Sequence, residues 1–488
     1  MNKELKNLNK EYGYLLKPLG IIMLVYFFAF SSIIRANYNY GDDIERLLFG
    51  VGGWTNFSRF TTESLSIYIH TSNYLTDISP LTQYIAIFLL AVSSVILLHL
   101  FKKDKRITLS NIISVIFVGV SPYFLSCISY KYDSPYMALS ILASLLPFIF
   151  YKSDQKNKTN DIIYSLLVIV GTIIMCTTYQ AASGIIPMVT IFLAFDLWNN
   201  KNVKESLRLV FLTAIDYVIG LLIFKLFIVV PSNYYAAETM FSMSEMIPGF
   251  VNNLLKYYKF LISDFRNIWF FFIGIIFIAF VFCKVSDSKQ DKKIALIGSL
   301  VFIIMTLLVV FGLYPCLEKT IFAPRTMYAV GVLISLYSIN ITSRKEMYLS
   351  KFIIFCLAWC FVSFSFTYGN CLSVQKEYIG TKIQMVLGSL NELEIMNRNV
   401  GKVLKIEGDM GFAKAIENMP LKYKGLVVRL MQQRFWNNYY LANFYDLGNV
   451  KIYLQDDKLE YDLEVVLDTL YYSISINSNY NFILLKFK

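Results

Sequence analysis

The chain has 488 residues, of which 56% are hydrophobic and 16% are charged, and its formal net charge is +11. Its mean hydropathy of +0.52 is far too high for a soluble globular protein. A positive net charge can indicate nucleic-acid binding, but here the basic residues lie mostly in short runs between apolar segments, where they act as topology signals. The composition therefore predicts a polytopic membrane protein and argues against a nucleic-acid partner.

Apolar runs of about 17–25 residues are long enough to cross a bilayer, and the sequence predicts eleven of them. The first run follows a basic N-terminal segment that has no signal-peptide cleavage pattern, so we expect it to be retained as a transmembrane helix. The predicted spans cover residues 18–37, 81–101, 109–128, 134–151, 161–177, 181–198, 208–230, 267–284, 294–313, 326–342 and 352–368.

The loops between these spans separate into two alternating sets by charge. The net-positive loops are short and cover residues 102–106, 152–158, 201–208, 284–293 and 344–351. The other loops cover residues 38–80, 130–133, 177–183, 231–266 and 314–325, and the first and longest of them is net acidic. Because positively charged loops stay in the cytoplasm, we expect a cytoplasmic N terminus and a C-terminal part outside the cytoplasm.

The sequence changes character after about residue 369, where apolar runs shorten and charges of both signs alternate. Residues 402–407, 450–454 and 482–487 are typical of strands, and residues 374–396 and 424–436 of helices. We therefore expect an all-α membrane domain at residues 1–368. A small α/β or α+β domain at residues 369–488 would dock on its outer face.

Several familiar catalytic sets are missing from the sequence. His70 and His99 are the two histidines, and no glycine-rich phosphate loop is present. The seven cysteines have no metal-ligand spacing, so no metal site and no cofactor are predicted. Whether Cys316 and Cys371, both expected on the outer side, form a disulfide stays open, since pairing cannot be deduced from sequence.

Polar residues instead gather in the outer loops, at similar depth on one side of the membrane. The candidate catalytic residues are Asp42 and Asp43, and the candidate substrate-binding residues are Arg46, Lys131, Asp133, Tyr179, Gln180, Lys319 and Arg325. This set suits sugar transfer from a polyprenyl-phosphate carrier. A carboxylate would accept the proton of the attacking hydroxyl, and a guanidinium would neutralise the phosphate leaving group.

Plainer interpretations stay open for the same residues. Arg325 could anchor the start of a helix at the interface, and Lys131 and Asp133 could pair with each other. Tyr179 and Gln180 could satisfy the backbone of a short hairpin. The neighbouring Asp42 and Asp43 could also bind a divalent ion.

Four short segments together carry a family resemblance: the acidic run at residues 40–46, the Tyr-Asp-Ser-Pro turn at 132–135, the Tyr-Gln pair at 179–180, and Pro324 with Arg325. In their order and placement they resemble the serotype-converting, phage-type O-antigen glucosyltransferases, which are membrane glycosyltransferases of the GT-C class. The resemblance covers most of the membrane half and does not extend to the C-terminal domain.

The resemblance implies transfer of glucose from undecaprenyl-phosphate-glucose to a lipid-linked O-antigen repeat, with inversion, on the periplasmic face of the bacterial inner membrane. It implies a donor flippase and a cytoplasmic-side donor synthase as functional partners. Two rivals remain: a flippase or transporter, whose charges should reach mid-membrane, and a lipid-linked glycan polymerase, which should have two large central outer loops.

Overall fold

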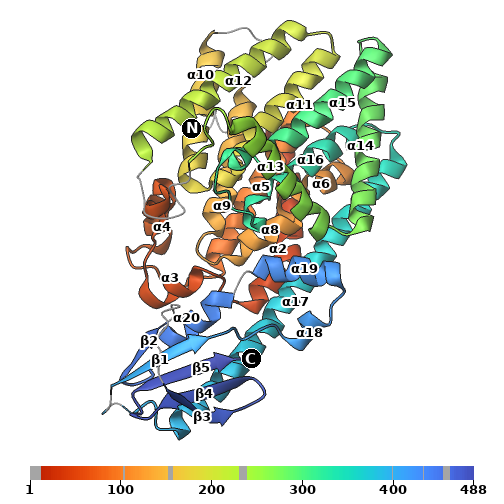
Figure 1. Ribbon diagram of the computed structural model, residues 1–488. Helices are drawn as coiled ribbons and strands as arrows, with labels where there is room; N and C mark the ends of the chain where they lie inside the picture. Colours follow the sequence, from red (N-terminus) through yellow and green to blue (C-terminus); the bar gives the residue numbers. More distant parts are fainter. Residues whose placement is uncertain are drawn as a thin grey trace.

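The computed structural model describes residues 12–102, 105–151, 158–229, 239–397, 399, 401–431, 434–453 and 462–488. Helices fill the upper part of the molecule in Figure 1, and a small sheet lies at the lower end. The helices before the sheet are α2 (Leu16–Ala36), α3 (Asp43–Phe49), α4 (Phe60–His70), α5 (Leu81–Phe101), α6 (Leu109–Val115), α7 (Phe117–Val120), α8 (Pro122–Ser129), α9 (Ser134–Leu145), α10 (Lys158–Thr178), α11 (Ile185–Asn199), α12 (Val203–Ile223), α13 (Met246–Asp264), α14 (Asn267–Asp287), α15 (Lys292–Val309), α16 (Ala329–Thr342) and α17 (Tyr348–Glu392). The short helical turns are η1 (Gly13–Leu15), η2 (Trp54–Phe57), η3 (Leu146–Phe150), η4 (Gln180–Gly184), η5 (Phe224–Ile228), η6 (Tyr314–Cys316) and η7 (Pro324–Thr326).

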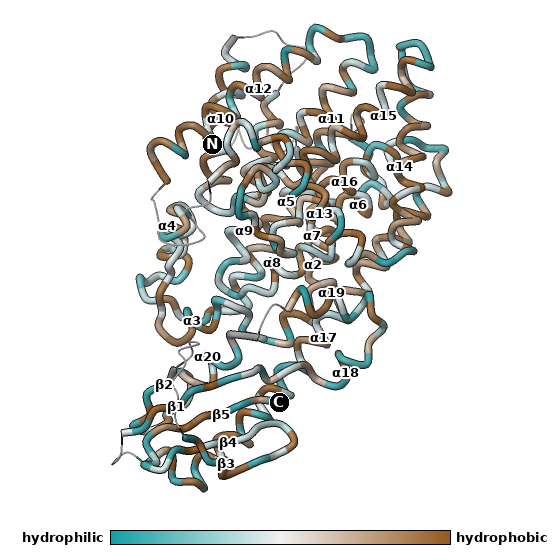
Figure 2. Tube along the Cα trace, in the orientation of Figure 1, coloured by the Kyte–Doolittle hydropathy of each residue, from teal (hydrophilic) through white to brown (hydrophobic). Residues whose placement is uncertain are grey.

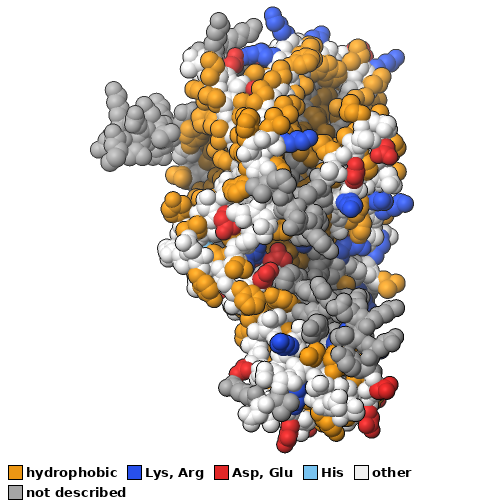
Figure 3. Space-filling view, turned by 60° about the vertical axis from the view of Figure 1, so that its left-hand side comes forward, with side chains coloured by type: hydrophobic (Ala, Val, Ile, Leu, Met, Phe, Trp, Pro, Cys, Tyr) orange, Lys and Arg blue, Asp and Glu red, His pale blue; other side chains and the backbone are white. Residues whose placement is uncertain are grey.

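Among the described residues, eight helices are long and apolar enough to cross a membrane, and a ninth span results if the bent pair 109–120 and 122–129 is one span. Two shorter apolar helices cover residues 134–150 and 329–342. Apolar residues run along these helices in Figure 2, and orange side chains cover the upper body in Figure 3. The chain is thus a largely helical membrane protein. The helices coincide with the eleven predicted ranges, while the number that crosses a bilayer stays a prediction.

The described parts of the predicted basic loops meet at one end of the bundle. Lys284 pairs with Asp196, and Arg344 pairs with Asp287. The backbone N–H of Lys289 donates to the carbonyl of Asn199 at 3.0 Å. These contacts join the loops after α11, α14 and α16, as the alternation of charge requires. The predicted basic loop 152–158 lies largely outside the described residues.

The C-terminal part forms a mixed sheet with helices beside it. Its strands are β1 (Lys402–Glu407), β2 (Val450–Tyr453), β3 (Leu463–Asp468), β4 (Tyr472–Asn477) and β5 (Phe482–Phe487), and its helices are α18 (Lys414–Glu417), α19 (Leu421–Met431) and α20 (Arg434–Phe444). The strand order is β2-β1-β5-β4-β3. β1 runs parallel to β2 and β5, with Val403 opposite Lys451 and Phe482, whereas β4 is antiparallel to β3 and β5. The three predicted strands are confirmed, and β3 and β4 were not predicted.

Two helix predictions need correction. The last span and the helix expected at 374–396 are one continuous helix, α17, of 45 residues. No proline interrupts this stretch, so no backbone donor is lost along it. The expected helix 424–436 corresponds to α19 and the start of α20, and residues 432–433 lie outside the described part. The predicted domain boundary at 368/369 falls inside α17, and the domain division stays a prediction.

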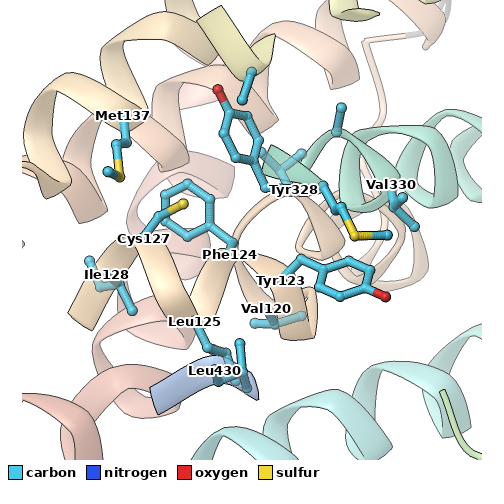
Figure 4. Close-up of a cluster of buried hydrophobic side chains, with 14 of the residues drawn as sticks. Val120, Tyr123, Phe124, Leu125, Cys127, Ile128, Met137, Tyr328, Val330 and Leu430 are labelled. Atoms are coloured by element: carbon cyan, nitrogen blue, oxygen red, sulfur yellow. The ribbon is translucent and has the colours of Figure 1, made fainter. Parts of the chain in front are cut away.

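A tightly packed apolar core lies next to the outer loops. Figure 4 shows α8 at its centre, with Phe124 and Cys127 facing Met137 of α9 and Tyr328 before α16. Leu430 of α19 closes the lower side of this cluster. The Tyr40 hydroxyl also donates to the Leu430 carbonyl. The first outer loop, the membrane helices and the C-terminal part therefore share one core.

Candidate active site

Asp43 fastens the first outer loop to the turn between α8 and α9. Its carboxylate accepts hydrogen bonds from the backbone N–H groups of Tyr40 at 3.3 Å, Lys131 at 2.9 Å and Tyr132 at 3.4 Å. The side chain is fully buried, and burial raises the pKa of Asp43 to about 7. Both carboxylate oxygens are engaged by the backbone, so Asp43 holds two loop segments together.

Asp42, by contrast, is exposed and lies beside Tyr130. The preceding Gly41 has φ +56, and a Cβ there would lie 3.4 Å from the Tyr130 ring. A residue with a side chain would be strained in this left-handed conformation, so glycine allows the chain to approach the ring closely. Burial raises the pKa of Tyr130 well above its usual value, and the charge of Asp42 adds to this rise.

Arg325 also contacts Tyr130. It lies in η7, and its Nη1 donates to the Tyr130 hydroxyl at 3.1 Å. Tyr130, Tyr179 and Asp42 raise the pKa of Arg325 well above its usual value. The exposed carboxylate of Asp42 and the guanidinium of Arg325 thus both lie near one tyrosine, although they come from loops more than 280 residues apart.

A second guanidinium approaches the same place from the start of α4. The Arg59 guanidinium carbon lies 4.7 Å from the ring centroid of Tyr179. Tyr179 also stacks on Tyr328, with ring centroids 6.1 Å apart. The buried Nε of Arg59 has no hydrogen-bond partner within the described part of the chain. Arg59 and Arg325 therefore place two positive charges around Tyr179.

Two ion pairs support the loops around these residues. Arg46 pairs with Asp133 at 2.6 Å, and Trp54 donates from its indole nitrogen to Asp133 at 2.5 Å. Lys131 pairs with Asp77 at 3.0 Å and donates to the Asn39 side chain at 2.8 Å. Lys131 and Asp133 do not pair with each other, because the turn that carries them directs each toward a different segment of the first outer loop.

The sequence from residue 31 to residue 336 matches the family Glucosyl transferase GtrII. This segment is more than half of the chain and contains all nine predicted site residues. The chain belongs to the glucosyl transferase GtrII family. The predicted resemblance to serotype-converting glucosyltransferases is thereby confirmed, and the family indicates a glycosyltransferase that acts in glucosyl transfer.

A relative of this GtrII-family chain occurs in Salmonella phage P22, where it is described as an uncharacterized 55.3 kDa protein in the gtrB 5′ region. The two sequences are 25% identical over 224 residues, which are 45% of this chain and 44% of the phage protein. The match thus spans less than half of that relative. No solved structure matches the chain.

The remaining predicted residues of the GtrII-family chain lie less centrally. Gln180 begins η4 and is half-buried, next to Tyr179. Lys319 is exposed between η6 and η7, and no contact within the described segments joins it to the cluster. The free thiols include both Cys316 and Cys371. No group of three or more His, Cys, Asp or Glu that could hold a metal ion occurs in the parts of the chain that are described.

Sequence reasoning missed Arg59, Asp77, Trp54 and Tyr130 as members of the site. Arg59 carried a usable signal, since it is one of two arginines in an outer loop that is otherwise net acidic. Asp77 and Trp54 had none, because their partners Lys131 and Asp133 lie more than 50 residues further along the chain.

Proposed function

We propose that this protein transfers glucose from undecaprenyl-phosphate-glucose to a lipid-linked O-antigen repeat, with inversion at the anomeric carbon. The observation that carries the proposal is that the exposed Asp42 carboxylate and the Arg325 guanidinium both lie beside Tyr130. A base and an anion-binding group are the two functions that this reaction requires of the protein.

Asp42 acts as the base in the proposed reaction. The acceptor hydroxyl oxygen attacks the anomeric carbon of glucose, and its proton passes to the Asp42 carboxylate. The bond between the anomeric carbon and the phosphate oxygen breaks, and its electron pair leaves with undecaprenyl phosphate. Asp42 is suited to this role because it is exposed, whereas Asp43 is buried with both oxygens bonded to backbone N–H groups. Asp43 is assigned a positioning role.

Arg325 and Arg59 bind the phosphate in the proposed complex. A guanidinium stays charged and can bind phosphate oxygens through two parallel hydrogen bonds. The unpartnered Nε of Arg59 supports this assignment, because a buried donor without a partner costs about 1–3 kcal/mol that a bound phosphate would remove. Both arginines lie near Tyr179.

The proposed setting is the bacterial inner membrane, with eleven spans, a cytoplasmic N terminus and the C-terminal part in the periplasm. The gathering of basic loops at the end opposite the sheet supports this orientation. The undecaprenyl tail stays in lipid, a flippase delivers the donor, and a cytoplasmic-side synthase makes it. The reaction needs no cofactor, and addition of a chelator is expected to leave the rate unchanged.

The test uses purified full-length protein in nanodiscs, undecaprenyl-phosphate-glucose and a lipid-linked repeat, with the product identified by mass spectrometry. The expected product is the repeat plus one hexose. Asp42→Asn is expected to lower turnover by about 10²–10⁴-fold, because an amide cannot take up the proton. Glu45→Gln is the matched control, since Glu45 is also exposed and lies on the adjacent α3.

Other products would refute the proposal. Elongated repeats without added hexose would instead indicate a polymerase. Transbilayer movement of the donor without any product would indicate a flippase. Equal activity of Asp42→Asn and Glu45→Gln would remove Asp42 from the mechanism.

A further inference from the structure

A cavity of about 210 Å³ lies between the first outer loop and the C-terminal part of the chain. Residues Tyr38, Asn39 and Ile44 form one wall, α17 forms the second, and α20 forms the third. Asn39 and Ile44 lie three residues before and two residues after Asp42. The cavity is therefore adjacent to the proposed base.

The position of the cavity relative to Asp42 is fixed by contacts on both sides of this loop. Tyr40 and Gly41 pack against Tyr130, which holds Arg325, with 4.6 Å between the ring centroids of Tyr40 and Tyr130. Tyr38 and Ile44 instead face the cavity. A ligand in the cavity would approach Asp42 from a different side than a phosphate bound by Arg325.

The walls of the cavity are joined by a hydrogen bond, and three tyrosines are among the residues that line them. Lys376 of α17 donates to the backbone carbonyl of Asn37 at 2.9 Å, which holds the outer loop against the helix. Tyr440 and Tyr445 line the α20 side, and Tyr440 is stacked on Phe444 with ring centroids 4.4 Å apart. Aromatic faces of this kind pack well against the C–H face of a pyranose ring.

The cavity also offers a polar group and open space. The Asn437 side chain is only 7% exposed and lines the cavity, so its amide is available to a ligand bound there. At Gly380, also in the wall, an added Cβ would meet no atom within 4 Å, so the space beside it is open.

We propose that this cavity binds one sugar ring of the acceptor glycan and so presents the acceptor hydroxyl to Asp42. The inference rests on the proposed function and names the part of the substrate that this subsite takes. The volume is below the range of about 300–1,000 Å³ that is typical for drug-sized ligands, which favours a single ring. Two tyrosine faces and an amide match the two surfaces of a sugar, one of C–H bonds and one of hydroxyl groups.

The test fills the cavity from one of its walls. Gly380→Phe places a ring in the open space, and Gly388→Phe is the matched control, because an added Cβ there also meets no atom within 4 Å and Gly388 does not line the cavity. Asn437→Ala removes the amide. We expect Gly380→Phe and Asn437→Ala to raise the acceptor KM by about tenfold or more, the equivalent of one hydrogen bond or more. The donor KM should stay the same in all three variants, and Gly388→Phe should keep the acceptor KM of the unaltered protein.

A binding measurement separates this inference from the proposed function. Saturation-transfer NMR on the nanodisc protein would use oligosaccharide released from unglucosylated lipopolysaccharide, with undecaprenyl phosphate as the second probe. Oligosaccharide signals should disappear in Gly380→Phe and persist in Gly388→Phe. If they do so in a protein that transfers no glucose, the proposed function fails and the subsite stands. No oligosaccharide binding to the unaltered protein, equal binding by both glycine variants, or a rise in donor KM would each overturn the subsite.

Discussion

Replacement of Arg46 by methionine tests whether this arginine holds the outer loop or binds substrate. Arg46 and Asp133 are both buried and lie 2.6 Å apart, and Trp54 supplies the third partner of the pair. Two unit charges about 4 Å apart attract by about 4 kcal/mol at an effective dielectric constant of 20. Removal of one partner of a buried pair costs about 3–5 kcal/mol, because the other charge stays buried. We expect Arg46→Met to lower the free energy of unfolding by this amount.

The double variant Arg46→Met/Asp133→Leu shows whether the loss comes from the orphaned charge. Replacement of a whole buried pair by apolar side chains is often neutral, so the double variant should recover most of the stability that Arg46→Met loses. The assay is thermal unfolding of the detergent-solubilised protein, with turnover measured per folded molecule. A stable Arg46→Met protein with a raised donor KM would refute the structural role and make Arg46 a phosphate ligand.

The other predictions concern the pH dependence, the phosphate site and the topology. The folded-state pKa of Asp43, about 7, lies above the usual value of 3.8, so Asp43 makes stability fall as pH rises from about 4 to about 7. Unfolding curves measured at a series of pH values should show that Asp43→Asn lacks this pH dependence. If the stability of Asp43→Asn varied with pH as in the unaltered protein, burial would not be raising the pKa of Asp43. Arg325→Ala should raise the barrier by about 2–4 kcal/mol, with partial rescue by Arg325→Lys measured as rate per inserted protein; full rescue by lysine would indicate an interfacial anchor instead. A reporter active only in the periplasm should work when fused after Lys488, and a cytoplasmic reporter should work at Lys158; the reverse pattern would overturn the proposed orientation.

Features carried by local sequence patterns were predicted well. Apolar run length gave the positions of the membrane helices, and alternation of loop charge placed the basic loops at one end. The same alternation predicted that Asp42 and Arg325 lie on one side, and the structure brings both to Tyr130. The family, inferred from short motifs in the membrane half, is confirmed. The roles of the site residues stay predictions.

Features that depend on distant partners were not predictable. The pairing of Arg46 with Asp133 and of Lys131 with Asp77 joins residues that are far apart in the chain, and no local pattern indicates such contacts. The helix α13 was missed within the loop 231–266 because it is too polar to be counted as a span. Strand β4, by contrast, carries a clear alternation of apolar and polar residues at 472–477 and could have been found.

The unbroken course of α17 makes the C-terminal part sensitive to the number of residues in one helix. At about 1.5 Å per residue, its 45 residues extend about 68 Å, from the basic loops to the sheet. One residue inserted after Tyr368 would turn everything beyond it by about 100°, and would swing Gly380 and the cavity wall away from Asp42. Seven inserted residues, close to two full turns, would nearly restore the direction but displace the wall by about 10 Å. The number of residues in α17 therefore determines whether the membrane helices and the C-terminal part face the same substrate.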